Sequence, residues 1–132
     1  MTVVLDASAL LAFLQDEDGA GVVEDHLSED ARCGAANWAE VAQKIRGAGR
    51  DWSLSRALLI SYGVAVESVT ESDGEWAAAR WRRGEGLSLA DRLCLSLAHR
   101  MHAPALTADA AWGPDDPVRQ IREPVSGASI IR

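Results

Sequence analysis

The sequence predicts a single α/β domain with three αβα layers, in which helices cover both faces of a central, mainly parallel sheet of four to five strands. Short apolar runs alternate with helical segments along the chain, and this alternation is typical of right-handed βαβ crossovers. A length of 132 residues suits one domain over 1–132, with a core that needs neither disulfides nor structural zinc. No internal repeat, low-complexity tract or linker divides the chain.

The first half of the chain begins with a strand that feeds a helix. Residues 2–5 form a short β-branched run that fits a strand buried on both faces, and the sequence then changes to helix-compatible Ala and Leu. The elements expected in this half are a strand over 2–5, helices over 8–14 and 22–29, a weak strand over 31–36, a helix that Asn37 opens and residues 47–49 close, and a helix over 52–62.

The second half repeats the alternation. Its elements are a strand over 64–69, a helix over 70–83 that contains Trp76 and Trp81, a helix over 89–101, a strand over 104–107 and an edge strand over 118–121. The helix over 89–101 has the clearest pattern, since Leu89, Leu93 and Leu97 recur every four residues.

Four carboxylates stand where the chain leaves apolar, strand-like runs: Asp6, Glu40, Asp91 and Asp109. In an open parallel sheet the loops at the carboxyl ends of the strands share one rim, and ligands bind there. We therefore expect the four side chains to meet. A cluster of oxygen ligands suits Mg²⁺, with Mn²⁺ as a substitute, better than zinc.

An alternative is that these acids only cap helices. Asn37 and Glu40, and likewise Ser88 and Asp91, have the spacing of a capping box. Capping explains Asp6 least well, because a carboxylate after a fully apolar strand is costly to bury unless it is paired. Ser8 can either orient Asp6 or serve as an ordinary helix N-cap.

The charge and the cysteines limit the class of protein. A formal net charge of −7 argues against broad nonspecific affinity for nucleic acid, although it does not exclude a nuclease. Cys33 and Cys94 have neither a CxxC nor a zinc spacing, so we expect two buried thiols in a reducing cytoplasm. No secretion signal or membrane span is recognisable.

Several other residues have two open interpretations. The basic groups are Lys44, Arg46, Arg50 and Arg56, and then Arg80, Arg82 and Arg83; both groups either face substrate or form solvated helix faces. Trp38 and Trp112 adjoin the acids and are candidates for stacking on a substrate base. Trp76 and Trp81 are expected in the core or at a dimer contact. His99 and His102 lack partner ligands for zinc.

Four segments carry a resemblance to the PIN domain family, and within it to the VapC-type toxins of bacterial toxin–antitoxin pairs. They are VLDASALL over 4–11, NWAEV over 37–41, LSLADRLCL over 87–95 and LTADAAW over 106–112. The resemblance implies a PIN-like fold and a cytoplasmic Mg²⁺- or Mn²⁺-dependent endoribonuclease with its acidic quartet at Asp6, Glu40, Asp91 and Asp109.

The same resemblance implies the partners of the chain. They are an RNA substrate, a cognate VapB-like antitoxin and a second copy in a homodimer, with no membrane. Ser8 and Asn37 are expected to support the acids, and Arg46 is expected to contact substrate together with Trp38 and Trp112. The alternative function is a noncatalytic α/β interaction module whose acidic residues are helix caps.

Overall fold

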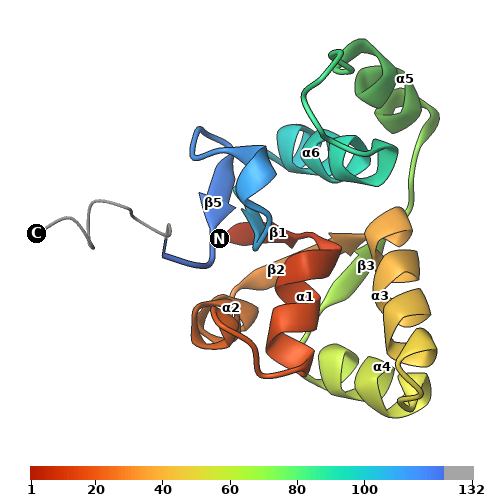
Figure 1. Ribbon diagram of the computed structural model, residues 1–132, viewed down its shortest axis with the longest axis vertical. Helices are drawn as coiled ribbons and strands as arrows, with labels where there is room; N and C mark the ends of the chain where they lie inside the picture. The colour runs from red at the N-terminus through yellow and green to blue at the C-terminus, as the bar shows by residue number, and fades with distance from the viewer. Residues whose placement is uncertain (124–132) are drawn as a thin grey trace, which may run out of the picture.

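Five parallel strands form the central sheet, in the spatial order β3-β2-β1-β4-β5 (Figure 1). The computed structural model describes residues 1–123; residues 124–132 of the domain expected over 1–132 lie outside the described residues. The strands are β1 (Thr2–Leu5), β2 (Asp30–Gly34), β3 (Ala65–Glu67), β4 (Ala105–Thr107) and β5 (Val118–Gln120). The expected parallel sheet is confirmed.

Helices cover both faces of this sheet, which gives the three expected layers. They are α1 (Ala7–Leu14), α2 (Ala20–Leu27), α3 (Ala35–Gly47), α4 (Trp52–Ser61), α5 (Glu71–Ala79) and α6 (Leu89–Met101), with a short 3-10 helix, η1 (Ala110–Trp112), after β4. In Figure 1, α5 and α6 lie on one side of the sheet, and α1, α2 and α4 lie on the other.

The first strand contributes to the core on both faces, as its apolar sequence predicts. Val3 and Leu5 pack in one cluster with α1 and α2, whereas Val4 packs in a second cluster with α6. All three side chains are fully buried. Because alternate side chains of a strand point to opposite faces, β1 joins the two halves of the core and fixes the position of the residue that follows it, Asp6.

The helix expected over 70–83 is shorter than predicted. It ends at Ala79, since Arg80 turns to pair with Glu85 through two hydrogen bonds of 2.6 and 2.9 Å. Gly84 then takes a positive φ of 77°, which an α-helix does not allow. Trp81 therefore lies in a loop and is 53% exposed. Of its two expected places, the core is wrong and a dimer contact stays a prediction.

The helix expected to open at Asn37 begins earlier. β2 runs directly into α3, whose N-cap is Gly34 and whose first residue is Ala35. Residues 35 and 36 are consequently helix rather than strand, and Asn37 lies inside the first turn. The capping box expected between Asn37 and Glu40 is therefore wrong, whereas the one between Ser88 and Asp91 is confirmed. The other boundaries differ by a few residues at most.

Both cysteines are buried, unpaired thiols, as predicted. Burial raises the pKa of Cys33 and of Cys94 far above the ordinary value of a thiol, so both remain protonated in the core. None of the helices within residues 1–123 combines the length and the hydrophobicity that crossing a membrane requires.

Candidate functional site

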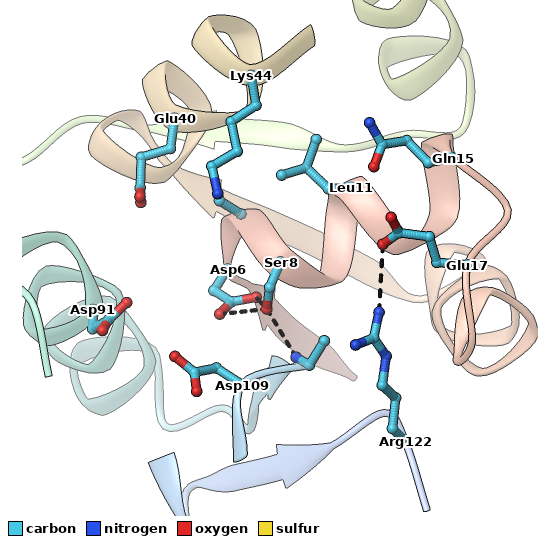
Figure 2. Close-up of a pocket in the computed structure, with 12 residues that line it drawn as sticks. Asp6, Ser8, Leu11, Gln15, Glu17, Glu40, Lys44, Asp91, Asp109 and Arg122 are labelled. Carbon is cyan, nitrogen blue, oxygen red and sulfur yellow. Dashed lines mark hydrogen bonds and ion pairs between the residues drawn. The ribbon is translucent and has the colours of Figure 1, made fainter. Parts of the chain in front are cut away.

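The four predicted acids line one pocket at the carboxyl-terminal edge of the sheet (Figure 2). Asp6 follows β1, Glu40 comes from the second turn of α3, Asp91 from the first turn of α6, and Asp109 follows β4. The pocket has a volume of about 400 Å³. Consecutive acids that are as many as 51 positions apart in the sequence are therefore brought together by the order of the parallel strands, as the sequence predicts.

Asp6 is the most buried of the four acids, at 4% exposure. It is the N-cap of α1, because its Oδ1 accepts a hydrogen bond of 2.8 Å from the backbone N–H of Ala9. The Ser8 hydroxyl lies 2.7 and 2.9 Å from the two carboxylate oxygens, and the Thr107 hydroxyl donates to Oδ2 over 2.6 Å. Three donors thus orient the Asp6 carboxylate, and their hydrogen bonds replace those that the buried group has lost to water.

Burial nevertheless dominates the protonation of this group. Desolvation raises the pKa of Asp6 to about 6, although the hydrogen bonds from Thr107, Ala9 and Ser8 act in the opposite direction; the charge of Asp91 raises it slightly further. A buried carboxylate held near other acids, with no cationic side chain bonded to it in the described residues, is the environment that a bound cation would stabilise.

Ser8 acts through Asp6, which decides between its two interpretations. Asp6 rather than Ser8 caps α1, and Ser8 donates to the cap. The Ser8 oxygen also accepts a hydrogen bond of 2.8 Å from the backbone N–H of Ala108. Ser8 therefore links the start of α1 to the segment after β4.

Thr107 is a site residue that the sequence analysis missed. Its hydroxyl donates to Asp6 and accepts a hydrogen bond of 3.0 Å from the backbone N–H of Asp109. The side chain is fully buried. A polar residue at the end of an apolar strand, two positions before a predicted ligand, was the available signal.

Asp91 and Asp109 each have one oxygen engaged in capping. Oδ2 of Asp91 accepts from the backbone N–H of Ser88 over 2.9 Å, and Oδ1 of Asp109 accepts from that of Ala111 over 2.9 Å. The second oxygen of each accepts no hydrogen bond within residues 1–123. Figure 2 shows both carboxylates and that of Asp6 around a common space. Capping and ligand binding are therefore compatible for these acids.

Glu40 is the acid that helix capping does not explain, because it lies inside α3 and accepts no capping bond in the described part of the chain. Burial raises its pKa, and the charge of Asp91 raises it further, whereas Lys44 and Asn37 lower it. Asn37 is 1% exposed, and its Nδ2 donates to the carbonyl of Ala90 over 3.3 Å. Asn37 thus ties α3 to the first turn of α6, between Glu40 and Asp91.

The donor set fits a hard divalent cation, since all four acids offer oxygen atoms and, within residues 1–123, Asp91 and Asp109 each keep one oxygen that accepts no hydrogen bond. Among residues 1–123, however, no three His, Cys, Asp or Glu side chains are already grouped tightly enough to hold a metal ion. Binding would therefore require rotation of the longer or more exposed acids toward Asp6, whose own orientation is fixed by three donors.

The expected substrate residues differ in their access to the pocket. Trp112 is only 8% exposed and packs in the core beside α6, which leaves little of its ring for stacking on a base. Trp38 is partly buried against Trp52, with ring centroids 5.3 Å apart. Arg46 is exposed but does not line the pocket, whereas Lys44 does. Arg122, which also lines it, was not considered in the sequence analysis.

Comparison with known proteins gives relatives along most of the chain. Residues 3–113 match the model of the PIN domain. A VapC ribonuclease of Mycobacterium bovis and ribonuclease VapC42 of Mycobacterium tuberculosis are each 32% identical over 115 residues, covering 78% of this chain and 87% of the relative.

Solved structures share the fold at low sequence identity. A toxin–antitoxin complex from Klebsiella pneumoniae contains a chain with a TM-score of 0.76 at 16% identity, covering 92% of this chain and 98% of that one. The toxin VapC20 of Mycobacterium tuberculosis, described as cleaving the sarcin–ricin loop, has a TM-score of 0.67 at 17% identity, covering 84% and 95%. These structures share the fold, and the match of residues 3–113 to the PIN domain model, together with the relatives at 32% identity, shows that the chain belongs to the PIN domain family.

Proposed function

We propose that this chain is a metal-dependent endoribonuclease that acts in the cytoplasm as the toxin of a toxin–antitoxin pair. The observation that supports this most strongly is the convergence of Asp6, Glu40, Asp91 and Asp109 on one pocket of a PIN domain. The alternative, a noncatalytic module with capping acids, accounts for three of them singly. It does not account for Glu40, nor for a common pocket.

RNA is the proposed substrate because the relatives at 32% identity are named ribonucleases. When bound, Mg²⁺ or Mn²⁺ would supply positive charge beside the scissile phosphate and favour deprotonation of the attacking water. Asp6 and Asp91 would hold the main cation, and Asp109 and Glu40 would complete the site. The RNA sequence recognised is a separate property, set by the surface around the pocket.

The side chains around the acids have distinct tasks in this reaction. Thr107 and Ser8 keep the Asp6 carboxylate in one orientation, so that its oxygens face the pocket. Glu40 has a raised pKa, which suits it to accept the proton that leaves the attacking water. Asn37 maintains the spacing of α3 and α6, and hence of Glu40 and Asp91.

A small VapB-like antitoxin is the proposed partner. Leu54 and Leu58 lie one turn apart on α4 and are 70% and 43% exposed, and Phe13 packs edge-on against Tyr62 beside them, with centroids 5.1 Å apart. These side chains offer an apolar surface to an amphipathic helix. An arginine from that partner would be suited to enter the pocket, because its guanidinium binds carboxylates bidentately and remains charged.

Residues 9–14 of α1 contribute little to this docking surface. Residues 9–12 are buried in the core of the chain itself, and only Phe13 and Leu14 are partly accessible.

We also propose a homodimer. Trp81 and Leu89, which are 53% and 57% exposed, are the candidates for the contact between the two copies.

Incubation of the purified chain with total RNA in Mg²⁺, in Mn²⁺ and in EDTA tests the proposed activity directly. We expect discrete cleavage with either cation and none with EDTA, and the mapped ends should be 5′-phosphates and 3′-hydroxyls. Intact RNA under all three conditions, from a chain that melts cooperatively, would favour the noncatalytic alternative.

A further inference from the structure

Lys44 lies in the pocket with the four acids, and its role is not explained by the proposed chemistry. It follows Glu40 by four residues on α3, so the two side chains lie on one face of the helix. Figure 2 shows the lysine reaching from α3 toward the space between Asp6 and Leu11. The helix that carries Glu40 therefore also places the positively charged ammonium group of Lys44 beside the four acids.

Lys44 forms no ion pair within residues 1–123. No carboxylate of residues 1–123 lies within 4.0 Å of its ammonium group, which distinguishes it from the other cation lining the pocket. Arg122 donates to the carbonyl of Asp18 over 2.9 Å and approaches Glu17 at 3.4 Å. Arg122 is thus engaged with the turn after α1, whereas Lys44 is available to a ligand.

An anion is the ligand that this arrangement fits. A strand of RNA entering a pocket with four carboxylates meets repulsion along its backbone, and a cation bound by the acids offsets this only at the scissile phosphate. Lysine binds phosphate as a point charge on a long, adaptable side chain. A lysine at the side of the pocket would offset the negative charge of a second phosphate of the same RNA strand.

We propose that Lys44 is a positioning residue that binds a backbone phosphate of single-stranded RNA next to the scissile bond. This inference rests on the proposed ribonuclease function and adds a contact by which the substrate is held. Because the contact is made equally before and during the reaction, its loss should raise KM and leave kcat nearly unchanged.

Three variants test this contact: Lys44→Gln, Lys44→Arg and, as a control, Arg50→Gln. Arg50 is exposed just beyond the end of α3 and does not line the pocket, so its substitution removes the same charge from a neighbouring position. Both substituted side chains, Lys44 and Arg50, are exposed, and melting temperatures close to that of the unmodified chain should verify that each of the three variants folds.

The first measurement is the binding of a fluorescein-labelled single-stranded RNA in Mg²⁺ at several salt concentrations, in an Asp91→Asn background that keeps the RNA intact. One phosphate contact contributes about −0.7 to the slope of log Kobs against log[salt] for a single strand. Lys44→Gln should make the slope shallower by about this amount and weaken binding roughly fivefold to tenfold at low salt. Lys44→Arg should retain the slope, and Arg50→Gln should leave it unchanged.

The second measurement is steady-state cleavage across pH without the Asp91 substitution. A KM for Lys44→Gln that rises about as much as binding weakens, with the pH profile unmoved, supports the phosphate contact.

A shifted pH profile with unchanged RNA binding would overturn the phosphate contact, because Lys44 would then act only on the protonation of Glu40. Wild-type binding and slope in Lys44→Gln overturn the inference while the proposed function stands. If the unmodified chain neither binds nor cleaves RNA, both the inference on Lys44 and the proposed ribonuclease function are wrong.

Discussion

The hydroxyl of Thr107 donates a hydrogen bond of 2.6 Å to the carboxylate of Asp6, although the two residues are 101 positions apart in the sequence. The bond joins the ends of β1 and β4, which are neighbours in the sheet. The backbone N–H of Asp109 donates to the same hydroxyl. A single buried side chain therefore sets the relative positions of two of the four acids.

Thr107→Val should lower metal affinity about 10- to 100-fold, which is typical when an outer partner of a ligand is lost. The substitution keeps the shape of the side chain but removes a donor to Asp6 and an acceptor for Asp109, at a cost of about 1–3 kcal/mol in the free energy of unfolding. Titration calorimetry with Mn²⁺ measures the affinity. Thr107→Ser keeps the hydroxyl and should bind nearly as well; equal affinity in all three proteins contradicts the proposed link.

Asp91→Asn should reduce RNA cleavage by more than about 100-fold, beyond the effect of losing an outer partner. The metal-free fold should keep its stability within about 0.5 kcal/mol, because the amide oxygen can still accept from Ser88 and one repelling charge is removed. Urea melts in EDTA and cleavage assays on the same preparation measure both. Full activity in this variant would remove Asp91 from the site.

Asp73→Asn provides the matched control, since Asp73 completes the capping box of α5 as Asp91 completes that of α6. Asp73 is buried, yet its pKa is about 2: burial alone would raise it, but Arg100, Thr70 and Ser96 hold it down. The variant leaves Arg100 without its charged partner and should lose about 2 kcal/mol of stability. Cleavage per folded molecule should be unchanged, and a large loss of activity would show that capping, rather than metal binding, controls the site.

The stability of the metal-free protein should depend on the protonation of Asp6. Its pKa of about 6 lies above the ordinary 3.8, so between these values the folded state binds more protons than the unfolded state. The contribution of this group to the free energy of unfolding therefore falls as pH rises from about 4 to 7, by roughly 1–3 kcal/mol. Urea melts in EDTA should show this dependence in the unmodified chain but not in Asp6→Asn; parallel curves would contradict it.

Mn²⁺ should raise the melting temperature more at pH 7.5 than at pH 5.5, because the cation competes with the proton for Asp6. A ligand that binds only the folded state at 100 times its Kd stabilises by about 2.7 kcal/mol. Differential scanning fluorimetry at millimolar Mn²⁺, with EDTA as reference, measures the shift. No shift at either pH, together with no heat of binding, would argue against a metal site.

Expression of the chain alone should slow bacterial growth, and co-expression with the adjacent small reading frame should restore it through a stable complex. Replacing Leu54 and Leu58 by Asp should abolish co-purification while RNA cleavage persists, since both side chains are exposed on α4. Normal growth without any co-purifying partner would refute the toxin function even if the nuclease activity stands.

The sequence predicted the layers, the parallel sheet and the four acids because each depends on local patterns: apolar runs, helical periodicity and the residue that follows a strand. It did not predict where α3 and α5 end or begin. Those limits depend on features that apolar periodicity does not show: β2 runs directly into α3, and Arg80 pairs with Glu85 in the loop after α5. Thr107 was missed, and Lys44 was left with two interpretations, because only the folded chain places these residues beside Asp6 and Glu40.

The position of β1 at the centre of the sheet also determines when the site can exist during synthesis. Asp6 is synthesised 101 positions before Thr107, and β4 must pair with β1 to bring the two residues together. A chain still under translation has exposed its first acid without the groups that orient it. A competent pocket can therefore form only after β4 has been made and has paired with β1.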